Sequence, residues 1–152
     1  PDPKPPVSSP TKIMSYSYFV SNWKTWPEYT SRNPFPSKGA NCTWYAHGRM
    51  MQLGYSEFAL DSMRGNAGDW DNTAARGAKV VSSPQVPSIA VWEANVGGAG
   101  RVGHVAVVER INADGSILIS ESNWPTGTTY GTRTIYPRTH RWPSKFITAP
   151  KA

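Results

Sequence analysis

The sequence predicts an α+β domain in which helices come first along the chain and an antiparallel sheet follows. Residues 41–76 show helical spacing ended by glycines, whereas residues 79–136 form short β-branched and apolar runs separated by turn formers. Helical runs followed by strand runs are typical of α+β folds, so we expect the helices to pack on the sheet. A length of 152 residues favours one domain, with roughly 70% of the extended-chain surface buried on folding.

The first part of the chain is expected to lack regular structure. Residues 1–15 are rich in proline and serine, which predicts an extended linker or arm, and a single folded domain is expected over residues 16–152. Between Tyr16 and Pro36, aromatic residues alternate with turn formers. This pattern predicts an irregular segment that covers another part of the fold.

Two helices are expected next. The first begins at Asn41 or Cys42 and ends at Gly54, because glycine adopts the left-handed conformation that closes many helices. The second is a short helix over residues 69–76, ended by Gly77.

Five strands are predicted after these helices, over residues 79–81, 88–93, 102–111, 116–122 and 132–136. Asp114-Gly115, between two β-branched runs, predicts a hairpin between the third strand and the fourth.

Cys42 is the only cysteine, so it cannot form an internal disulfide and is either a buried apolar filler or a reactive thiol. Its place at a predicted helix start favours the thiolate, because the unpaired N–H groups and the helix dipole stabilise an anion there. The same first-turn N–H groups, including that of Cys42, are suited to hold an oxyanion.

His104 opens an apolar strand, and Glu121 and Asn123 end the next one. If the hairpin loop has an even number of residues, all three side chains lie on one face of the sheet. A turn centred on Asp114-Gly115 places Asn123 diagonal to His104, whereas a loop centred on residues 112–113 places Glu121 directly opposite. A bulge would reverse this facing. The register therefore decides which side chain contacts the histidine.

These residues predict nucleophilic catalysis. A thiolate attacks, an imidazole takes and returns a proton, and a carboxylate or amide orients the imidazole. Glu121 on an apolar strand also requires a hydrogen-bond donor, and a histidine N–H is a suitable one. We therefore expect Cys42, His104, Glu121 and Asn123 to form the catalytic site.

The other histidines are given structural roles: His47 is expected to pack or to lie at the surface, and His140 to be solvated. No spacing resembles a zinc site, and the pair Asp69 and Asp71 lacks the further carboxylates of a calcium loop, so we expect no metal.

Tryptophan is abundant, with seven residues. Trp124, just past the proposed site, is the best candidate for lining a substrate groove, and Trp44 beside the cysteine is a second candidate. Core packing is the alternative for both, and it is the expectation for Trp70 and Trp92.

The net charge of +6 and a pI near 9.6 predict attraction to anionic polymers, among them nucleic acid, anionic lipid surfaces and cell-wall polymers. Most basic residues are scattered singly, and the only loose cluster is Arg133, Arg138, Arg141 and Lys145. This spread favours a role in solubility over a nucleic-acid site. No apolar run reaches the roughly 18 residues of a membrane span.

Three ordered motifs resemble those of the CHAP domains, which are cysteine, histidine-dependent amidohydrolases and peptidases with a papain-like fold. The motifs are Cys42-Thr43-Trp44-Tyr45, Gly103-His104-Val105-Ala106-Val107-Val108 and Glu121-Ser122-Asn123. Residues 66–77 are similar to the intermediate helix of the family, and the resemblance covers residues 38–124. Pro87-Ser88 stands where the family usually has Gly-Asp, which alters the turn into the following strand.

The resemblance implies hydrolysis of an amide bond in peptidoglycan, either between muramic acid and L-alanine or within the stem peptide or cross-bridge. It makes Cys42 the nucleophile, His104 the general base and then acid, and Glu121 the orienting residue assisted by Asn123. The side-chain amide of Asn41 would assist the oxyanion hole. No cofactor is expected.

The resemblance also implies a secreted or exported protein that acts at the cell wall or in the periplasm. Peptidoglycan is the expected partner, and an immunity or inhibitor protein is a possible second one. The alternative is a catalytically inactive module on the same fold that binds the cell wall or a glycan. Nucleic-acid binding is a third hypothesis that only the charge supports.

Overall fold

The computed structural model describes residues 10–152. Its helices are α1 (Tyr16–Asn22), α2 (Cys42–Gln52), α3 (Glu57–Leu60) and α4 (Trp70–Thr73), with short 3-10 turns η1 (Trp23–Thr25), η2 (Pro27–Tyr29) and η3 (Ala67–Asp69). Its strands are β1 (Lys79–Val81), β2 (Ser88–Trp92), β3 (His104–Ile111), β4 (Ile117–Glu121), β5 (Gly131–Ile135) and β6 (Lys145–Thr148).

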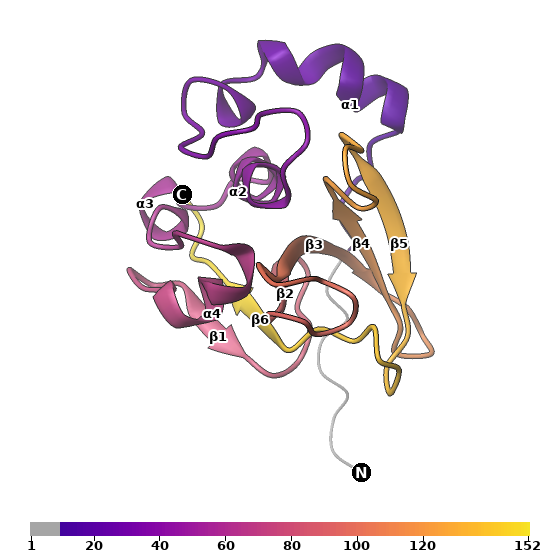
Figure 1. Cartoon of the computed structure of the whole chain (residues 1–152). Coiled ribbons are helices and arrows are strands. Elements are labelled where there is room, and N and C mark those ends of the chain that lie inside the picture. Colours follow the sequence, from indigo (N-terminus) through magenta and orange to yellow (C-terminus); the bar gives the residue numbers. More distant parts are fainter. Residues whose placement is uncertain (1–9) are drawn as a thin grey trace.

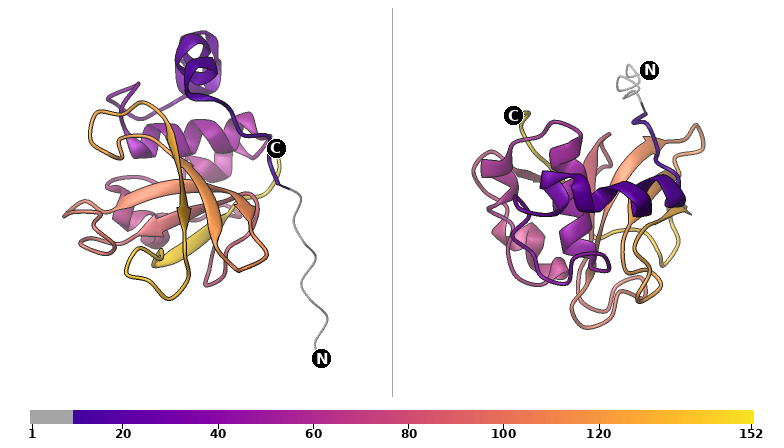
Figure 2. Two further views of the ribbon diagram at one scale, coloured as in Figure 1. Left: turned by 90° about the vertical axis from the view of Figure 1, so that its right-hand side faces the viewer. Right: turned by 90° about the horizontal axis from the view of Figure 1, so that it is seen from above.

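The strands form one antiparallel sheet in the order β1-β6-β2-β3-β4-β5. Helix α2 packs on the sheet, and α1 lies above α2, so helices cover one face of the sheet (Figures 1 and 2). The predicted α+β fold is confirmed.

Helix α2 begins and ends where the sequence predicts. Asn41 has an extended backbone and its side chain accepts a hydrogen bond from the Thr43 N–H, which caps the helix start. At the other end Gly54 has a φ of +97° and its N–H donates to the Met51 carbonyl. Because only glycine adopts this φ without strain, the chain reverses at the expected residue.

Two helices and one strand were not expected: α1, the four-residue α3 and β6. The segment after Tyr16, predicted to be irregular, begins with helix α1, whose start is capped by the Ser15 side chain. Only Phe19 of this helix is buried, so the helix leaves no hydrophobic period in the sequence. Strand β6 has only two buried residues, Phe146 and Ile147, yet it lies between β1 and β2 in the sheet.

The remaining differences are small. The helix predicted over residues 69–76 is divided into the turn η3 and the short helix α4. The turn that leads into β2 at Pro87-Ser88 is stabilised by the Ser88 hydroxyl, which donates to the Gln85 carbonyl at 2.7 Å. The strand forms in spite of the departure.

The main hydrophobic core lies between α2 and the sheet and is unusually aromatic. Phe19 is its centre, with rings of Tyr29, Trp44, Tyr45 and Tyr130 at centroid distances of 5.0–6.0 Å. A second, smaller core lies on the opposite face of the sheet, where Trp142 packs against Phe146. The aromatic segment after Tyr16 therefore does cover the fold, as expected, by packing over α2.

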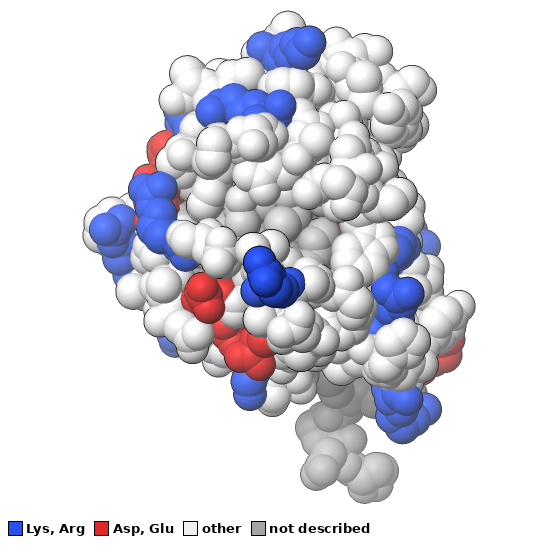
Figure 3. All heavy atoms as spheres, in the orientation of Figure 1, with Lys and Arg blue, Asp and Glu red and all other residues white. Residues whose placement is uncertain are grey.

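Basic side chains are scattered over the face shown in Figure 3, with a further group on the right, over β5 and the segment that follows it. In the part of the chain that the structure describes, no helix is long and apolar enough to cross a membrane. No group of three or more His, Cys, Asp or Glu within residues 10–152 is placed to hold a metal ion.

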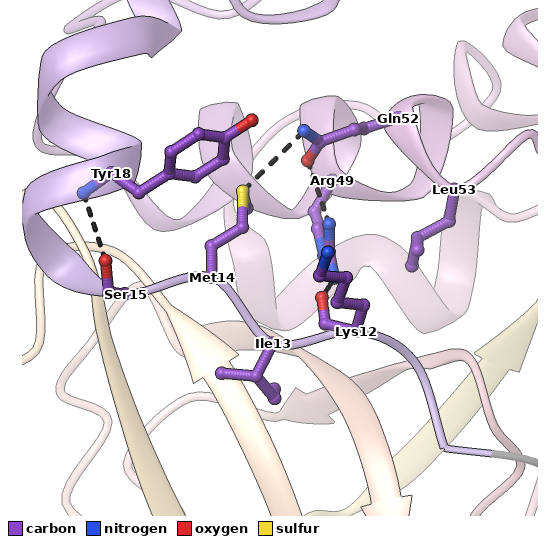
Figure 4. Close-up of a pocket in the computed structure, with 8 residues that line it drawn as sticks. All are labelled: Lys12, Ile13, Met14, Ser15, Tyr18, Arg49, Gln52 and Leu53. Carbon is purple, nitrogen blue, oxygen red and sulfur yellow. Dashed lines mark hydrogen bonds between the residues drawn. The ribbon is translucent and has the colours of Figure 1, made fainter.

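The described end of the predicted linker or arm, residues 11–15, has no regular helix or strand and packs against the domain. The Thr11 N–H donates to the Glu109 carbonyl, the Lys12 carbonyl accepts from Arg49, and the Met14 carbonyl accepts from Tyr130. Met14 is buried, and the segment runs across the end of α2 (Figure 4). Residues 1–9 lie outside the described part of the chain.

Candidate active site

Cys42 is the first residue of α2, and its surroundings hold the start of that helix in place. The Asn41 N–H donates to the Ser122 hydroxyl oxygen at 3.2 Å, which joins the helix start to the segment after β4. The Cys42 residue is 9% exposed, whereas Trp44 and Tyr45 are fully buried. The thiol is free and lies at the margin of the core.

His104 is the first residue of β3, and the residue before it explains how the strand can begin there. Gly103 has a φ of +73°, and a Cβ atom at this position would come within 2.4 Å of the Gly68 Cα. The Gly68 N–H donates to the Val102 carbonyl at 2.9 Å. A glycine is therefore required for the close approach of η3 that places His104.

The β3–β4 register brings His104 and Glu121 onto one face by two irregularities that cancel. Near the turn Ile111 pairs with Ile117, which leaves a loop of five residues. Because five is an odd number, this loop alone would place His104 and Glu121 on opposite faces of the sheet. A bulge between Val108 and Arg110 adds one residue to β3 and restores the shared face. Continued from the pair Val107 and Ser120, this register places Glu121 diagonal to His104.

The histidine and the glutamate are in direct contact. His104 Nε2 lies 2.8 Å from Glu121 Oε1, and the side chains of both residues are nearly fully buried. The Cys42 side chain lies close enough to the His104 ring to raise the pKa of the imidazole. The structure thus brings together Cys42, His104 and Glu121 in the order that a thiol hydrolase requires.

Burial alone would lower the pKa of the His104 imidazole, because desolvation disfavours the charged ring. The neighbouring side chains of Cys42 and Glu121 oppose this effect and raise the pKa of His104 to about 9. The ring is therefore an imidazolium at neutral pH and is able to give a proton to a leaving group.

We expect the His104 ring to titrate near pH 9 in wild type, in place of the ordinary 6.5, when followed by NMR. Cys42→Ala removes one of the two side chains that raise the pKa of this ring, so that pKa should fall. Because the folded pKa is raised, protonation stabilises the folded state fully below pH 6.5, and this stability is lost as the pH rises through about 9. The free energy of unfolding, measured with urea, should therefore fall less over that pH range for Cys42→Ala than for wild type. A wild-type ring titrating near 6.5 would contradict the arrangement.

Arg133, on β5, completes the environment of Glu121. Its Nε and Nη2 atoms lie 2.6 and 2.9 Å from the two carboxylate oxygens, so the carboxylate is held by arginine and histidine together. Bidentate pairing of this kind fixes the orientation of a carboxylate as well as its charge. No pattern in the sequence connects Arg133 with the site, because only the pairing of β5 with β4 brings Arg133 to Glu121.

Two tryptophans flank His104. The ring centroid of Trp92, which pairs with His104 in the sheet, lies 5.4 Å from the imidazole, and that of Trp124 lies 5.0 Å away. Trp124 is half-buried, a position compatible with the predicted substrate contact. Trp92 was expected only in the core, and it forms part of the site as well.

Trp44 lies in the core, which corrects its prediction as a substrate contact. Its side chain is fully buried, its ring packs on Trp23, and its indole N–H donates to the Tyr29 carbonyl at 2.8 Å. Cys42 keeps an exposed fraction of 9%, whereas the residue two positions later is turned fully inward, because neighbouring helix positions face different directions.

The two asparagines have local partners. The Asn123 side-chain oxygen accepts from the Gly127 N–H at 2.7 Å, so this side chain closes its own loop. The Asn41 side chain accepts from Thr43 and donates to the Pro36 carbonyl. A catalytic role for Asn123 and an oxyanion role for Asn41 stay predictions.

The remaining histidines have the structural roles expected of them. His47 is buried with its Nε2 2.8 Å from Asp61, and burial lowers the pKa of its ring although Asp61 opposes the shift. His140 is exposed.

A model of the CHAP domain family matches residues 30–123. The chain is 39% identical over 113 residues to an N-acetylmuramoyl-L-alanine amidase domain-containing protein of Staphylococcus aureus, covering 73% of this chain and 17% of that protein. It is 42% identical over 99 residues to the N-acetylmuramoyl-L-alanine amidase sle1 of Staphylococcus epidermidis, covering 62% of this chain and 28% of that protein. The chain therefore spans less than a third of the length of these two relatives.

Solved structures show the same fold. The crystal structure of an N-acetylmuramoyl-L-alanine amidase from Staphylococcus aureus matches with a TM-score of 0.63 and 38% identity, over 76% of this chain and 32% of that chain. The structure of Ly7917 matches with a TM-score of 0.55 over 90% of this chain and 63% of that chain, and at 18% identity this likeness concerns the fold alone.

Proposed function

Because the chain belongs to the CHAP domain family, we propose that it is a peptidoglycan hydrolase that cleaves an amide bond with Cys42 as its nucleophile. The observation that carries the proposal is the buried hydrogen bond between His104 and Glu121, with the Cys42 side chain next to the same imidazole ring. The names of the relatives favour the bond between muramic acid and L-alanine. An endopeptidase activity on the stem peptide or cross-bridge uses the same chemistry.

The first half of the reaction forms a thioester. The Cys42 thiolate attacks the carbonyl carbon, and the negative charge moves to the carbonyl oxygen. First-turn N–H groups of α2, including that of Cys42, hold this oxyanion, since they have no partner within the helix. The imidazolium of His104 then gives its proton to the leaving nitrogen, the C–N bond breaks, and the amine departs.

The second half restores the enzyme. Neutral His104 takes a proton from water, the resulting hydroxide attacks the thioester carbon, and the carboxylic acid is released as the thiolate forms again. Glu121 holds the Nε2 side of the ring, so the other nitrogen stays directed to Cys42 and the substrate. Arg133 keeps Glu121 in that orientation and acts as a positioning residue.

We infer that the protein acts outside the cytoplasm, where peptidoglycan is found. Its net charge of +6 supports this role, because it attracts the chain to anionic wall polymers.

The direct test is digestion of purified peptidoglycan with wild type and with Cys42→Ala, followed by mass spectrometry. New fragments are expected from wild type only, and free L-alanine amino termini among them would identify the muramoyl–alanine bond. Other new termini would identify an endopeptidase. Cys42→Ala should keep the thermal unfolding transition, since the thiol is at the margin of the core. Binding to peptidoglycan without any cleavage would reject the hydrolase and favour the inactive binding module.

A further inference from the structure

An open hollow of about 620 Å³ lies beside the catalytic residues, on the side of β5 and the segment after it. Its lining includes Trp124, Arg133, Tyr136, His140 and Arg141, and none of its eight lining residues is acidic. Basic side chains gather over this part of the molecule on the right of Figure 3. The loose basic cluster noted in the sequence is thus partly assembled into a concave surface.

Trp124 connects the hollow to the catalytic site. Its ring centroid is 5.0 Å from that of His104, and the guanidinium carbons of Arg133 and Arg141 lie 4.2 and 5.5 Å from the centre of the same indole. A molecule seated in the hollow would therefore be separated from His104 by one indole ring.

Arg141 is held in place by several contacts. Its backbone carbonyl accepts from the Trp92 indole at 2.6 Å, and its Nη1 donates to the Gly97 carbonyl at 3.2 Å. A Cβ at Gly98 would come within 2.9 Å of that Nη1 atom, so a glycine leaves room for the guanidinium. The backbone of Arg141 is thus tied to Trp92, and its exposed side chain is bonded to Gly97 and lies beside the Trp124 ring.

The two arginines differ in what balances their charge. Arg133 is paired with Glu121, whereas Arg141 forms no ion pair within the described part of the chain. Its bond to Gly97 uses one of the five N–H donors of a guanidinium. Arg141 therefore retains both a charge and donors for a bound group.

We propose that the hollow is a subsite for a negatively charged group of the substrate, with Arg141 as its principal contact. This inference rests on the proposed function and names the part of the substrate that is recognised. Stem peptides carry free carboxylates near their amide bonds, and a guanidinium binds a carboxylate through two parallel hydrogen bonds. The exposed ring of Tyr136 and the indole of Trp124 supply apolar surface for the rest of the peptide.

Carboxylate and phosphate share this chemistry, and the location of the hollow favours the carboxylate. Because Trp124 adjoins both His104 and Arg141, the hollow is within reach of the same molecule whose amide lies at Cys42. A phosphate group of a separate wall polymer would have no reason to lie so close to the reacting bond.

The test uses Cys42→Ala protein, which binds peptide without cleaving it. The probes are the stem pentapeptide L-Ala-D-Glu-L-Lys-D-Ala-D-Ala with free carboxylates, the same peptide with its carboxyl groups amidated, and a glycerol phosphate oligomer. Kd is measured from the NMR shift of the Trp124 indole N–H. Arg141→Gln should raise the Kd of the free-carboxylate peptide about tenfold, as expected for loss of one charge-assisted contact. The amidated peptide should bind about tenfold more weakly and be unaffected by Arg141→Gln.

Arg138→Gln is the matched control, because it removes the same charge from the same segment at an exposed residue that does not line the hollow. Its Kd values should equal those of the parent protein. An unchanged Kd in Arg141→Gln, or equal binding of the amidated peptide, would overturn the subsite. Binding of the phosphate oligomer through Arg141, without binding of the peptide, would overturn its assignment to a stem-peptide carboxylate.

The two proposals can fail separately. Cleavage of peptidoglycan by wild type together with binding that is independent of Arg141 would reject the subsite alone. Arg141-dependent binding of the peptide without cleavage by wild type would reject the hydrolase and keep the subsite.

Discussion

His104→Gln is expected to lower kcat/KM for peptidoglycan fragments by about 10⁴-fold or more, because residues of one catalytic unit act together and removal of one disables the others. The imidazole supplies the proton to the leaving nitrogen, and no neighbouring group can replace it. Glutamine can still donate to Glu121, whose other contacts with Arg133 remain, so the buried carboxylate keeps partners. The fold should therefore persist, and the loss should lie in kcat.

The measurement is the initial rate of release of the fragment identified for wild type, with far-ultraviolet circular dichroism and thermal unfolding as the check on folding. A folded His104→Gln protein with activity within about tenfold of wild type would contradict the assigned role.

Arg49→Met is expected to destabilise the protein by about 3–5 kcal/mol, which is the usual effect of removing one partner from a buried ion pair. The Arg49 and Glu109 side chains are almost fully buried, with Arg49 Nε 2.9 Å from Glu109 Oε2. Arg49 also donates to the Lys12 carbonyl and to Gln52, so it joins the N-terminal segment to the end of α2 and to the bulge in β3. Removing it leaves the Glu109 carboxylate with hydroxyl partners only, from Thr11 and Ser120.

Urea unfolding measures the change, and Arg110→Met is the control, because that arginine is exposed on the same strand as Glu109 and should change the free energy of unfolding by less than about 0.5 kcal/mol. The double variant Arg49→Met with Glu109→Gln should recover part of the loss, since no buried charge is left without a cation. If the losses of unfolding free energy in the two single variants simply add in the double variant, the two side chains are not directly coupled and the prediction is wrong.

The sequence was sufficient for the elements that follow simple local rules. The cap at Asn41 and the stop at Gly54 bound α2, and β-branched runs predict five of the six strands. Helix α1 and strand β6 could not be predicted from the sequence, because each buries too few residues to produce a periodic pattern of apolar residues. Both are stabilised by packing on neighbours that are distant in the sequence.

The chemical character of the site was determined by the sequence alone: a lone cysteine at a helix start, a histidine that opens an apolar strand, and a carboxylate at the end of the next one. These depend on residue type and on local structure, which neighbouring residues control. Whether His104 contacts Glu121 was decided only by the tertiary structure, because a five-residue loop and a bulge in β3 had to compensate each other. The same holds for Arg133 and Arg141, whose contacts with Glu121 and Trp124 arise from strand pairing and loop packing between segments separated along the chain. Long-range pairing depends on the sum of many weak packing energies, and no local pattern encodes that sum.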